Sequence, residues 1–357
     1  MTAEESATGL RASWAAEFTP RRWLSNGHSQ TLAGNFLRRG LQLPEPEPLL
    51  VEVEGPVAGY GPSQVLCHCH WQAPEVRRAR LTVVLVHGLE GSSNSQYVVG
   101  NTARALAAGL NVVRMNMRTC GGTDALSPTI YHSGRSGDMG RVVEAIVREQ
   151  RLQAVALVGY SMGANLVLKY TGEMGAALPP EVKAAVGISP LMDLAASSAA
   201  LHLPLNRIYE WHFLRNMLAR VRRRIAMYPR IYGEANVGRI RSMRDFDNEI
   251  VARYGGFRDA DDYYCSVASS RFAGLLPVPT LIVHSVDDPF IRMLPETREA
   301  LLGNPRVTFL ETQQGGHCAF LTSGRDLGDD GRWAERMLLG FLLEQGVRAN
   351  GEVVRGS

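Results

Sequence analysis

A serine stands at the centre of residues 159–163, which read GYSMG. This is the G-x-S-x-G pattern of a nucleophile elbow, in which a sharp strand-to-helix turn lifts a serine hydroxyl above a sheet. The pattern also arises by chance, so its context decides. Here an apolar run typical of a strand, residues 154–160, comes before Ser161, and a helical stretch, residues 162–175, follows it. We therefore interpret Ser161 as a nucleophile.

A serine hydroxyl is a weak nucleophile until a base takes its proton, and the base needs an acid to orient it. With a nucleophile elbow, the acid and the histidine follow in the order Ser, Asp, His, near the ends of the last strands. After the apolar run 279–285 come Asp287 and Asp288, and after the run 306–311 comes His317 in a glycine turn. His317 is the predicted base, and either aspartate is a candidate acid.

Attack on a carbonyl creates an oxyanion, which two backbone N–H groups must stabilise. We predict that one belongs to Met162, directly after the nucleophile. The second is predicted to be Leu89, in the turn HGLEG of residues 87–91, which follows the strand-like run 81–87. His87 is expected to brace this loop by hydrogen bonds, and His87 and Gly88 are expected to border the substrate pocket.

Three further residues follow the apolar run 111–116 and are predicted to line the pocket floor: Arg118, Thr119 and Cys120. Cys120 has no base beside it in the sequence, so it is not assigned as a nucleophile. The CHCH motif of residues 67–70 suggests zinc at first sight. On an alternating strand, however, its cysteines and histidines face opposite sides, so one metal ion cannot take all four. We predict neither a metal nor a cofactor.

The elements that position these residues are short apolar runs alternating with helical stretches. This rhythm predicts an α/β protein with a mostly parallel sheet and helices on both faces. The rhythm breaks after residue 194 and resumes at residue 279, which indicates a helical insertion over the edge of the sheet where ligands bind. The predicted parts are an N-terminal segment packed on the core (1–48), the core (49–194 and 279–347), a helical cap or lid (195–278) and a flexible tail (348–357).

Composition narrows the classes of function. The 357 residues are 45% hydrophobic and carry a net charge of +3, which is too small to indicate a nucleic-acid partner. The first residues lack the apolar core of a signal peptide or membrane anchor. The five cysteines are an odd, scattered set, which favours a reducing compartment. We therefore expect a cytoplasmic protein.

Several blocks together resemble the α/β-hydrolases, and more narrowly the subfamily of bacterial YheT-type esterases and animal lipases of the α/β-hydrolase-domain group. Besides GYSMGAN, they are WLSNGHSQT, HGLEGSSNSQY, NMRTCGG, YHSGRSGDM, FDNEIVARYGGF, DADDYYCSVAS, VDDPF and GGHCAF. The resemblance implies the α/β-hydrolase fold and makes Asp288, directly before Pro289, the triad acid, with Asp287 in the local turn. Three residues depart from the pattern: Ser29, Thr119 and Ala164. The last two are expected to narrow the space beside Ser161.

These observations predict a serine esterase that cleaves small-molecule carboxylic esters of short to medium chain length. A thioesterase or amidase with the same triad, and a non-catalytic binding protein of this fold, remain alternatives. In the insertion, Trp211, Leu214, Leu218, Val221 and Ile225 recur at spacings of three and four, as on one helix face. Arg215, Arg220, Arg222, Arg223 and Arg224 lie mostly away from it. The helix is expected to cover the pocket with its arginines in water, or to make weak contact with an anionic membrane surface.

Overall fold

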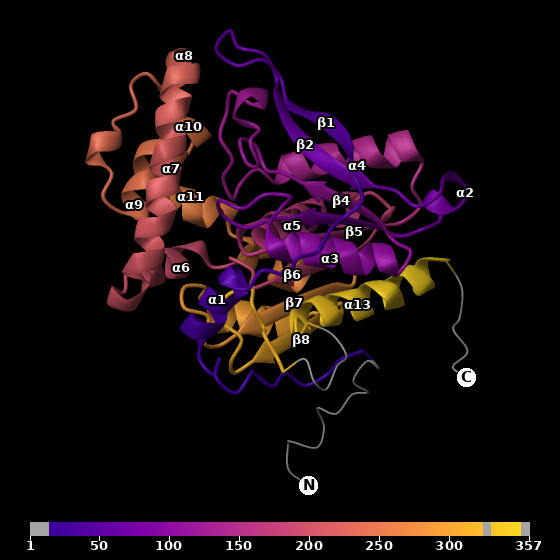
Figure 1. The fold of residues 1–357 in the computed structure, drawn as a ribbon. Coiled ribbons are helices and arrows are strands. Elements are labelled where there is room, and N and C mark those ends of the chain that lie inside the picture. The colour runs from indigo at the N-terminus through magenta and orange to yellow at the C-terminus, as the bar shows by residue number, and fades with distance from the viewer. Residues whose placement is uncertain (1–13, 324–329, 351–357) are drawn as a thin grey trace, which may run out of the picture.

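The computed structural model describes residues 14–323 and 330–350. The predicted N-terminal segment and C-terminal tail therefore fall in part, at residues 1–13 and 351–357, outside the described residues. A central sheet lies between two layers of helices, and a further group of helices stands beside one end of the sheet (Figure 1).

The eight strands form one sheet in the order β1-β2-β4-β3-β5-β6-β7-β8. Their bounds are β1 Glu47–Glu54, β2 Ser63–His70, β3 Thr82–Val86, β4 Asn111–Met115, β5 Val155–Tyr160, β6 Val182–Ile188, β7 Thr280–Ser285 and β8 Val307–Thr312. β2 pairs antiparallel with both β1 and β4, whereas the remaining pairs are parallel. The predicted α/β fold with a mostly parallel sheet is confirmed.

The central strands are largely apolar because helices cover both of their faces. All residues of β3 and β5 are buried. Along β3, Val84 and Val86 join the apolar cluster of α4 (Ser136–Gln150) and α5 (Met162–Met174). Val83 and Leu85 point the other way, into the cluster of α3 (Gln96–Ala107) and α13 (Trp333–Asn350). The alternation of side chains along a strand thus joins the two halves of the core.

The other helices lie at the edges or beyond the strand ends. They are α1 Gly27–Phe36, α2 Pro74–Arg77, α6 Leu194–Leu201, α7 Arg207–Met227, α8 Pro229–Tyr232, α9 Met243–Phe246, α10 Arg253–Gly255, α11 Ala260–Val267 and α12 Pro295–Gly303. A π-helical stretch, η5, spans Asp247–Ala252, and short 3-10 turns connect several elements. Within the described ranges, no helix has the length and apolar character that crossing a membrane requires.

The helices between β6 and β7 have an apolar cluster of their own. α7, α9 and α11 contribute Leu214, Val221, Phe246 and Tyr263 among others, and Ile130 joins them from the loop before α4. Figure 1 shows α7 as the long helix of this group, standing beyond the ends of the strands. The cluster explains why this part of the chain keeps a fixed shape although it forms no strand.

The prediction for the face of α7 is wrong in two respects. Trp211, which was expected in the buried stripe, is 59% exposed, while Met217 is buried beside Leu214 and Val221. Arg220 and Arg224 do not lie in water: Arg220 bonds Glu90 and the carbonyl oxygen of Thr119, and Arg224 is fully buried. These side chains turn inward because the loop after β3 and the loops after β4 present acceptors to α7. The exposed arginines of the set are Arg215, Arg222 and Arg223.

The N-terminal segment packs on the sheet domain through aromatic contacts. Trp14 meets Phe341 of α13 edge-on at 5.8 Å between ring centroids, and Phe18 meets Trp333 at 5.4 Å. At the other end, α13 continues through Asn350, so residues 348–350 of the predicted tail belong to a helix.

Candidate active site

Ser161 lies in the sharp turn between β5 and α5. Its backbone is strained, with φ of 55° and ψ of −117°. The turn brings α5 very close to β5 and to the end of β3: a Cβ on Gly159 would lie 2.3 Å from the carbonyl oxygen of Gly163, and one on Gly163 would lie 2.4 Å from that of His87. Only glycine fits at both positions, which explains the G-x-S-x-G spacing and leaves the serine hydroxyl at the carboxyl end of the sheet.

The structure brings the three predicted side chains together. His317 Nε2 lies 3.0 Å from Ser161 Oγ, and His317 Nδ1 lies 2.8 Å from Asp288 Oδ2. The other Asp288 oxygen accepts from the backbone N–H of Phe290 and Ile291. The neighbouring Asp287 instead accepts from Ser285 Oγ and from the N–H of Gly316, so it holds the local turns. Between the two aspartates, geometry favours Asp288 as the partner of His317.

Charge and burial set the protonation states of this pair. Burial is the largest single influence and lowers the pKa of His317, but the charge of Asp288, the neighbouring Cys318 and the hydrogen bonds to both together raise the pKa above its ordinary value. Burial raises the pKa of Asp288, yet its charge interaction and hydrogen bond with His317 bring the pKa below the ordinary value. The carboxylate therefore stays ionised and stabilises an imidazolium on His317, which is the form that a general base reaches after taking a proton.

Two backbone N–H groups beside Ser161 are free to bind a ligand. Met162 is the first residue of α5, and Leu89 follows β3 in the adjacent loop. Within the described parts of the chain, neither N–H has a hydrogen-bond acceptor. Gly88 brings the loop close: a Cβ there would lie 3.1 Å from the Cβ of Ser161. This is the arrangement that an oxyanion requires, two donors without partners next to the nucleophile.

His87 holds this loop and lies behind the cavity wall rather than on it. Its Nε2 accepts from the N–H of Met117, so its Nδ1 carries the proton and donates to the carbonyl oxygen of Gly88 at 2.8 Å. Burial lowers the pKa of His87 to about 4, which keeps the ring neutral and this tautomer in place. The expectation that His87 borders the pocket is wrong, whereas Gly88 does line it.

The predicted pocket floor is also wrong. Arg118 is buried and does not line the cavity. Its guanidinium group donates hydrogen bonds to Asp138, Glu54 and Thr129 instead. Thr119 and Cys120 are buried as well, and neither lines the cavity. Because burial raises the pKa of Cys120 to about 12, its thiol is not ionised. Ala164 is fully buried and outside the cavity lining, so it does not narrow the space beside Ser161 as expected.

Residues of the N-terminal block hold the loop of His317, a role that we had not predicted. Thr31 Oγ1 accepts from the N–H of His317 at 2.9 Å. Gln30 is fully buried and bonds both the N–H and the carbonyl oxygen of Leu321. His28 of the same block contacts α7: its ring stacks on Tyr209, with 3.2 Å between Nδ1 and the hydroxyl. The run of polar residues in the block WLSNGHSQT was the sequence feature that could have predicted this role.

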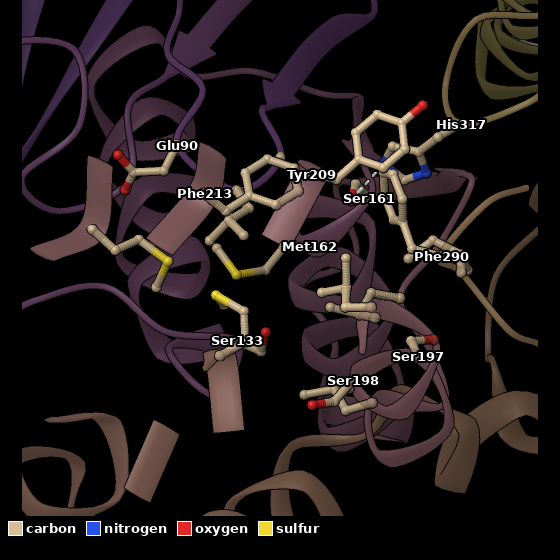
Figure 2. Close-up of a pocket in the computed structure, with 18 of the residues that line it drawn as sticks. Glu90, Ser133, Ser161, Met162, Ser197, Ser198, Tyr209, Phe213, Phe290 and His317 are labelled. Carbon is tan, nitrogen blue, oxygen red and sulfur yellow. Dashed lines mark hydrogen bonds between the residues drawn. The ribbon is translucent and has the colours of Figure 1, made fainter. Parts of the chain in front are cut away.

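A largely apolar cavity opens beside Ser161. Leu89, Met162, Leu194, Phe213, Val251 and Phe290 are among its lining residues, and α1, α6, α7 and α11 all contribute to its walls. Figure 2 shows Ser161 and His317 side by side at one side of the cavity, with Tyr209 and Phe290 next to them. An apolar lining of this kind suits the hydrocarbon part of a ligand.

The CHCH motif lies on β2, and none of its four residues lines the cavity beside Ser161. Cys67 and Cys69 are buried in the apolar core, while His68 Nδ1 contacts Ser93 Oγ at 3.1 Å. In the described part of the chain, no group of three or more histidine, cysteine or acidic side chains is placed to hold a metal ion.

Comparison of the sequence with known proteins independently supports the same fold. The family described as "alpha/beta hydrolase fold" matches residues 82–323. The chain is 32% identical to YheT of Escherichia coli (strain K12), which carries an esterase name, over 92% of this chain and 93% of that protein. It is 30% identical to phospholipase ABHD3 of Bos taurus over 68% of this chain, but it spans only 59% of that protein's length.

A solved structure is similar in fold at low sequence identity. The Pyrococcus furiosus esterase Pf2001 superposes with a TM-score of 0.54 at 14% identity, over 86% of this chain and 98% of that chain. At this identity the likeness concerns the fold alone. The match to the family over most of the chain, together with the identity to YheT over nearly the whole of both proteins, shows that this chain belongs to the α/β-hydrolase family.

Proposed function

We propose that this protein is a serine carboxylesterase in which Ser161, His317 and Asp288 form the catalytic triad. The observation that carries the proposal is the continuous hydrogen-bonded line from Ser161 Oγ through His317 to Asp288, at 3.0 and 2.8 Å, at the edge of an apolar cavity. The esterase and phospholipase names of its relatives support ester hydrolysis as the reaction.

In the proposed reaction, His317 Nε2 takes the proton of Ser161 as its Oγ attacks the ester carbonyl carbon. The negative charge moves to the carbonyl oxygen, where the N–H groups of Leu89 and Met162 stabilise it. The tetrahedral intermediate then collapses: the C–O bond to the alcohol breaks, and His317 returns the proton to the departing oxygen. Water repeats the sequence on the acyl-serine, with His317 as base, and releases the acid.

The character of the cavity supports esters with short to medium apolar chains. Its walls carry aromatic and aliphatic side chains such as Phe213, Val251 and Phe290, against which an apolar chain could pack. A thioester or amide would meet the same triad, so these remain alternative substrates. A protein of this fold that only binds ligands is the other alternative, but the strained serine and two unpartnered N–H groups are features that binding alone does not need.

Labelling with a fluorophosphonate tests the proposal, because only an activated serine reacts. We expect the wild type to be labelled and to hydrolyse nitrophenyl butyrate, and Ser161→Ala to lose both properties while its thermal unfolding is unchanged. A panel of nitrophenyl esters of increasing chain length then measures chain preference. An unlabelled wild type with no turnover would leave the binding protein as the better explanation, and labelling of Ser161→Ala would place the nucleophile elsewhere.

We further propose that the helices of residues 195–278 act as a lid and that any membrane contact is weak. Leu205, Ile208 and Trp211 expose apolar surface near the start of α7, and the Arg215 guanidinium lies over the Trp211 ring at 4.9 Å. Such a surface gains from both apolar burial and charge attraction at an anionic membrane. Sedimentation with anionic vesicles tests the membrane contact: we expect binding at low salt that high salt reverses, and absence of binding at low salt would leave Arg215, Arg222 and Arg223 as a solvated face. The five cysteines are all free, which supports a reducing cytoplasm as the compartment.

A further inference from the structure

One part of the cavity wall is polar, in contrast to its apolar surroundings. Three lining residues from three different elements form a hydrogen-bonded chain there: Ser198 of α6, Tyr264 of α11 and Asp247 at the start of η5. The hydroxyls of Ser198 and Tyr264 lie 2.9 Å apart, and the Tyr264 hydroxyl lies 2.6 Å from Asp247 Oδ2. Figure 2 shows Ser198 well separated from Ser161 and His317, so this chain is not part of the triad.

The donors and acceptors of this chain run in one direction. A carboxylate only accepts, so Tyr264 donates to Asp247 Oδ2, and the Tyr264 oxygen in turn accepts from Ser198. Among residues 14–323 and 330–350, no hydrogen bond reaches the other carboxylate oxygen, Oδ1, and Oδ1 is not one of the fully buried polar atoms, so it keeps access to the space of the cavity that Asp247 lines. Asp247 is only 8% exposed, so bulk water satisfies little of it. The chain therefore ends on an acceptor that faces the cavity, where a donor group of a ligand could reach it.

The surroundings of Asp247 favour a neutral donor over a cation. Burial raises the pKa of Asp247 to about 7, and the hydrogen bond from Tyr264 and the charge of Arg244 offset only part of the rise. Arg244 itself is directed to Asp261, at 2.6 Å. An ammonium group would have to lose its strong hydration to enter an apolar cavity, whereas a hydroxyl group loses much less hydration.

We propose that Asp247 recognises a hydroxyl group on the substrate chain, so that the preferred esters are hydroxylated at a position remote from the ester carbonyl. This deepens the proposed function and rests on it. The hydroxyl would donate to Oδ1 while the hydrocarbon between it and the ester lies along the apolar wall. Sites that hydrogen-bond a substrate hydroxyl discriminate strongly against analogues without it, because the buried polar group is then left unpaired.

The test compares three nitrophenyl esters of equal chain length: the plain ester, its ω-hydroxy derivative and its ω-methoxy derivative, over a series of chain lengths. A methoxy group accepts hydrogen bonds but cannot donate. At pH 8 the wild type should favour hydroxy over methoxy in kcat/KM by about tenfold to a hundredfold at one chain length, the range for a hydrogen bond to a charged group. A parallel series of butyrate esters of diols and their methyl ethers covers a hydroxyl on the alcohol side.

Asp247→Asn is the informative variant because the amide keeps an acceptor for Tyr264 and presents N–H groups in place of Oδ1. Its hydroxy-to-methoxy ratio should fall to near one. Tyr264→Phe is the matched control: it removes a hydroxyl from the same chain but keeps the carboxylate, so the ratio should stay high.

Equal ratios in the wild type and Asp247→Asn on both the acyl and the alcohol series would overturn the inference. So would a higher kcat/KM for an ω-amino ester than for the ω-hydroxy ester, since the site would then select a cation. The plain ester and fluorophosphonate labelling of Ser161 separate this result from failure of the proposed function. If neither shows reactivity, the esterase proposal fails and this inference fails with it.

Discussion

Replacing Arg220 by methionine should lower turnover more than it weakens substrate binding. Arg220 comes from α7, and its guanidinium bonds both carboxylate oxygens of Glu90 at 3.2 Å and the carbonyl oxygen of Thr119. Glu90 is the residue after Leu89 in the loop that carries a proposed oxyanion donor, and it also accepts from the Tyr131 hydroxyl at 2.6 Å. The pair thus joins the lid to the oxyanion loop, which makes Arg220 a positioning residue.

The magnitude follows from the burial of the pair. The side chains of Arg220 and Glu90 are 12% and 11% exposed, with 3.1 Å between the charged atoms. At an effective dielectric constant near 20 their attraction is about 5 kcal/mol, most of which offsets the loss of hydration. Removing one partner leaves the other buried and unpaired, which costs about 3 kcal/mol of stability. An oxyanion donor is worth about a hundredfold or more in kcat, so a displaced but present Leu89 N–H should cost about tenfold.

Urea unfolding and the kinetics of nitrophenyl butyrate hydrolysis measure the two effects. We expect Arg220→Met to lose about tenfold in kcat with KM changed less than threefold, and Glu90→Gln to lose a similar amount. Arg222→Met, two residues away on the exposed face of the same helix, is the control and should resemble the wild type. The double variant should be no worse than either single one, because the two residues act as a unit. Additive losses, or a full kcat in Arg220→Met, would refute the reasoning.

Three further predictions concern the site. Activity needs neutral His317, and the charge of Asp288 raises the pKa of His317. Asp288→Asn should therefore shift the acid limb of the pH profile of kcat/KM to lower pH and reduce the maximal kcat/KM by about a thousandfold or more. Asp287→Asn should leave the midpoint of the acid limb in place, and the reverse pattern would make Asp287 the triad acid. Thr31→Val removes the acceptor for the His317 N–H, which should lower kcat about threefold to tenfold without abolishing fluorophosphonate labelling; unchanged kinetics would mean that the loop is held without it. Cys120→Ala should keep full turnover, because the thiol is buried and lies outside the cavity lining, and loss of activity with an intact fold would contradict this.

Much of the fold was predictable because it depends on local patterns. A buried parallel strand is a short apolar run bounded by turn residues, and β3, β5 and β7 coincide with such runs. The meeting of Ser161, His317 and the adjacent aspartates was also predictable, since each follows a strand and the carboxyl ends of parallel strands gather at one edge of the sheet. Strand order and the choice of Asp288 depend on contacts between distant segments, and for the aspartate the resemblance to a family supplied what the pattern could not.

Errors arose where a polar side chain finds a partner far away in the sequence. Arg118 follows β4 as expected, but its direction is decided by Asp138 on α4 and by Glu54 on β1, and no rule of spacing relates the three. The same holds for Arg224, whose guanidinium bonds carbonyl oxygens of Asp124 and Ser127 and lies over the ring of Tyr228 at 4.1 Å. A helical wheel separates apolar from charged residues, yet it cannot distinguish a charge in water from one with buried acceptors.

The hydrogen bonds of Arg220 and Arg224 connect α7 to the loops near Ser161. If α7 had kept all of its arginines in water, the lid would be held over the cavity by apolar contacts alone, and its movement would leave the catalytic loops unaffected. Because Arg220 bonds the oxyanion loop and Arg224 bonds the loops after β4, a displacement of α7 must break charged hydrogen bonds at two places on the sheet domain. If α7 moves to admit substrate, as we propose for the lid, entry of substrate and alignment of the proposed oxyanion donor Leu89 N–H should be coupled through this helix. A cavity ligand that shifts α7 should change the reactivity of Ser161 without touching the triad.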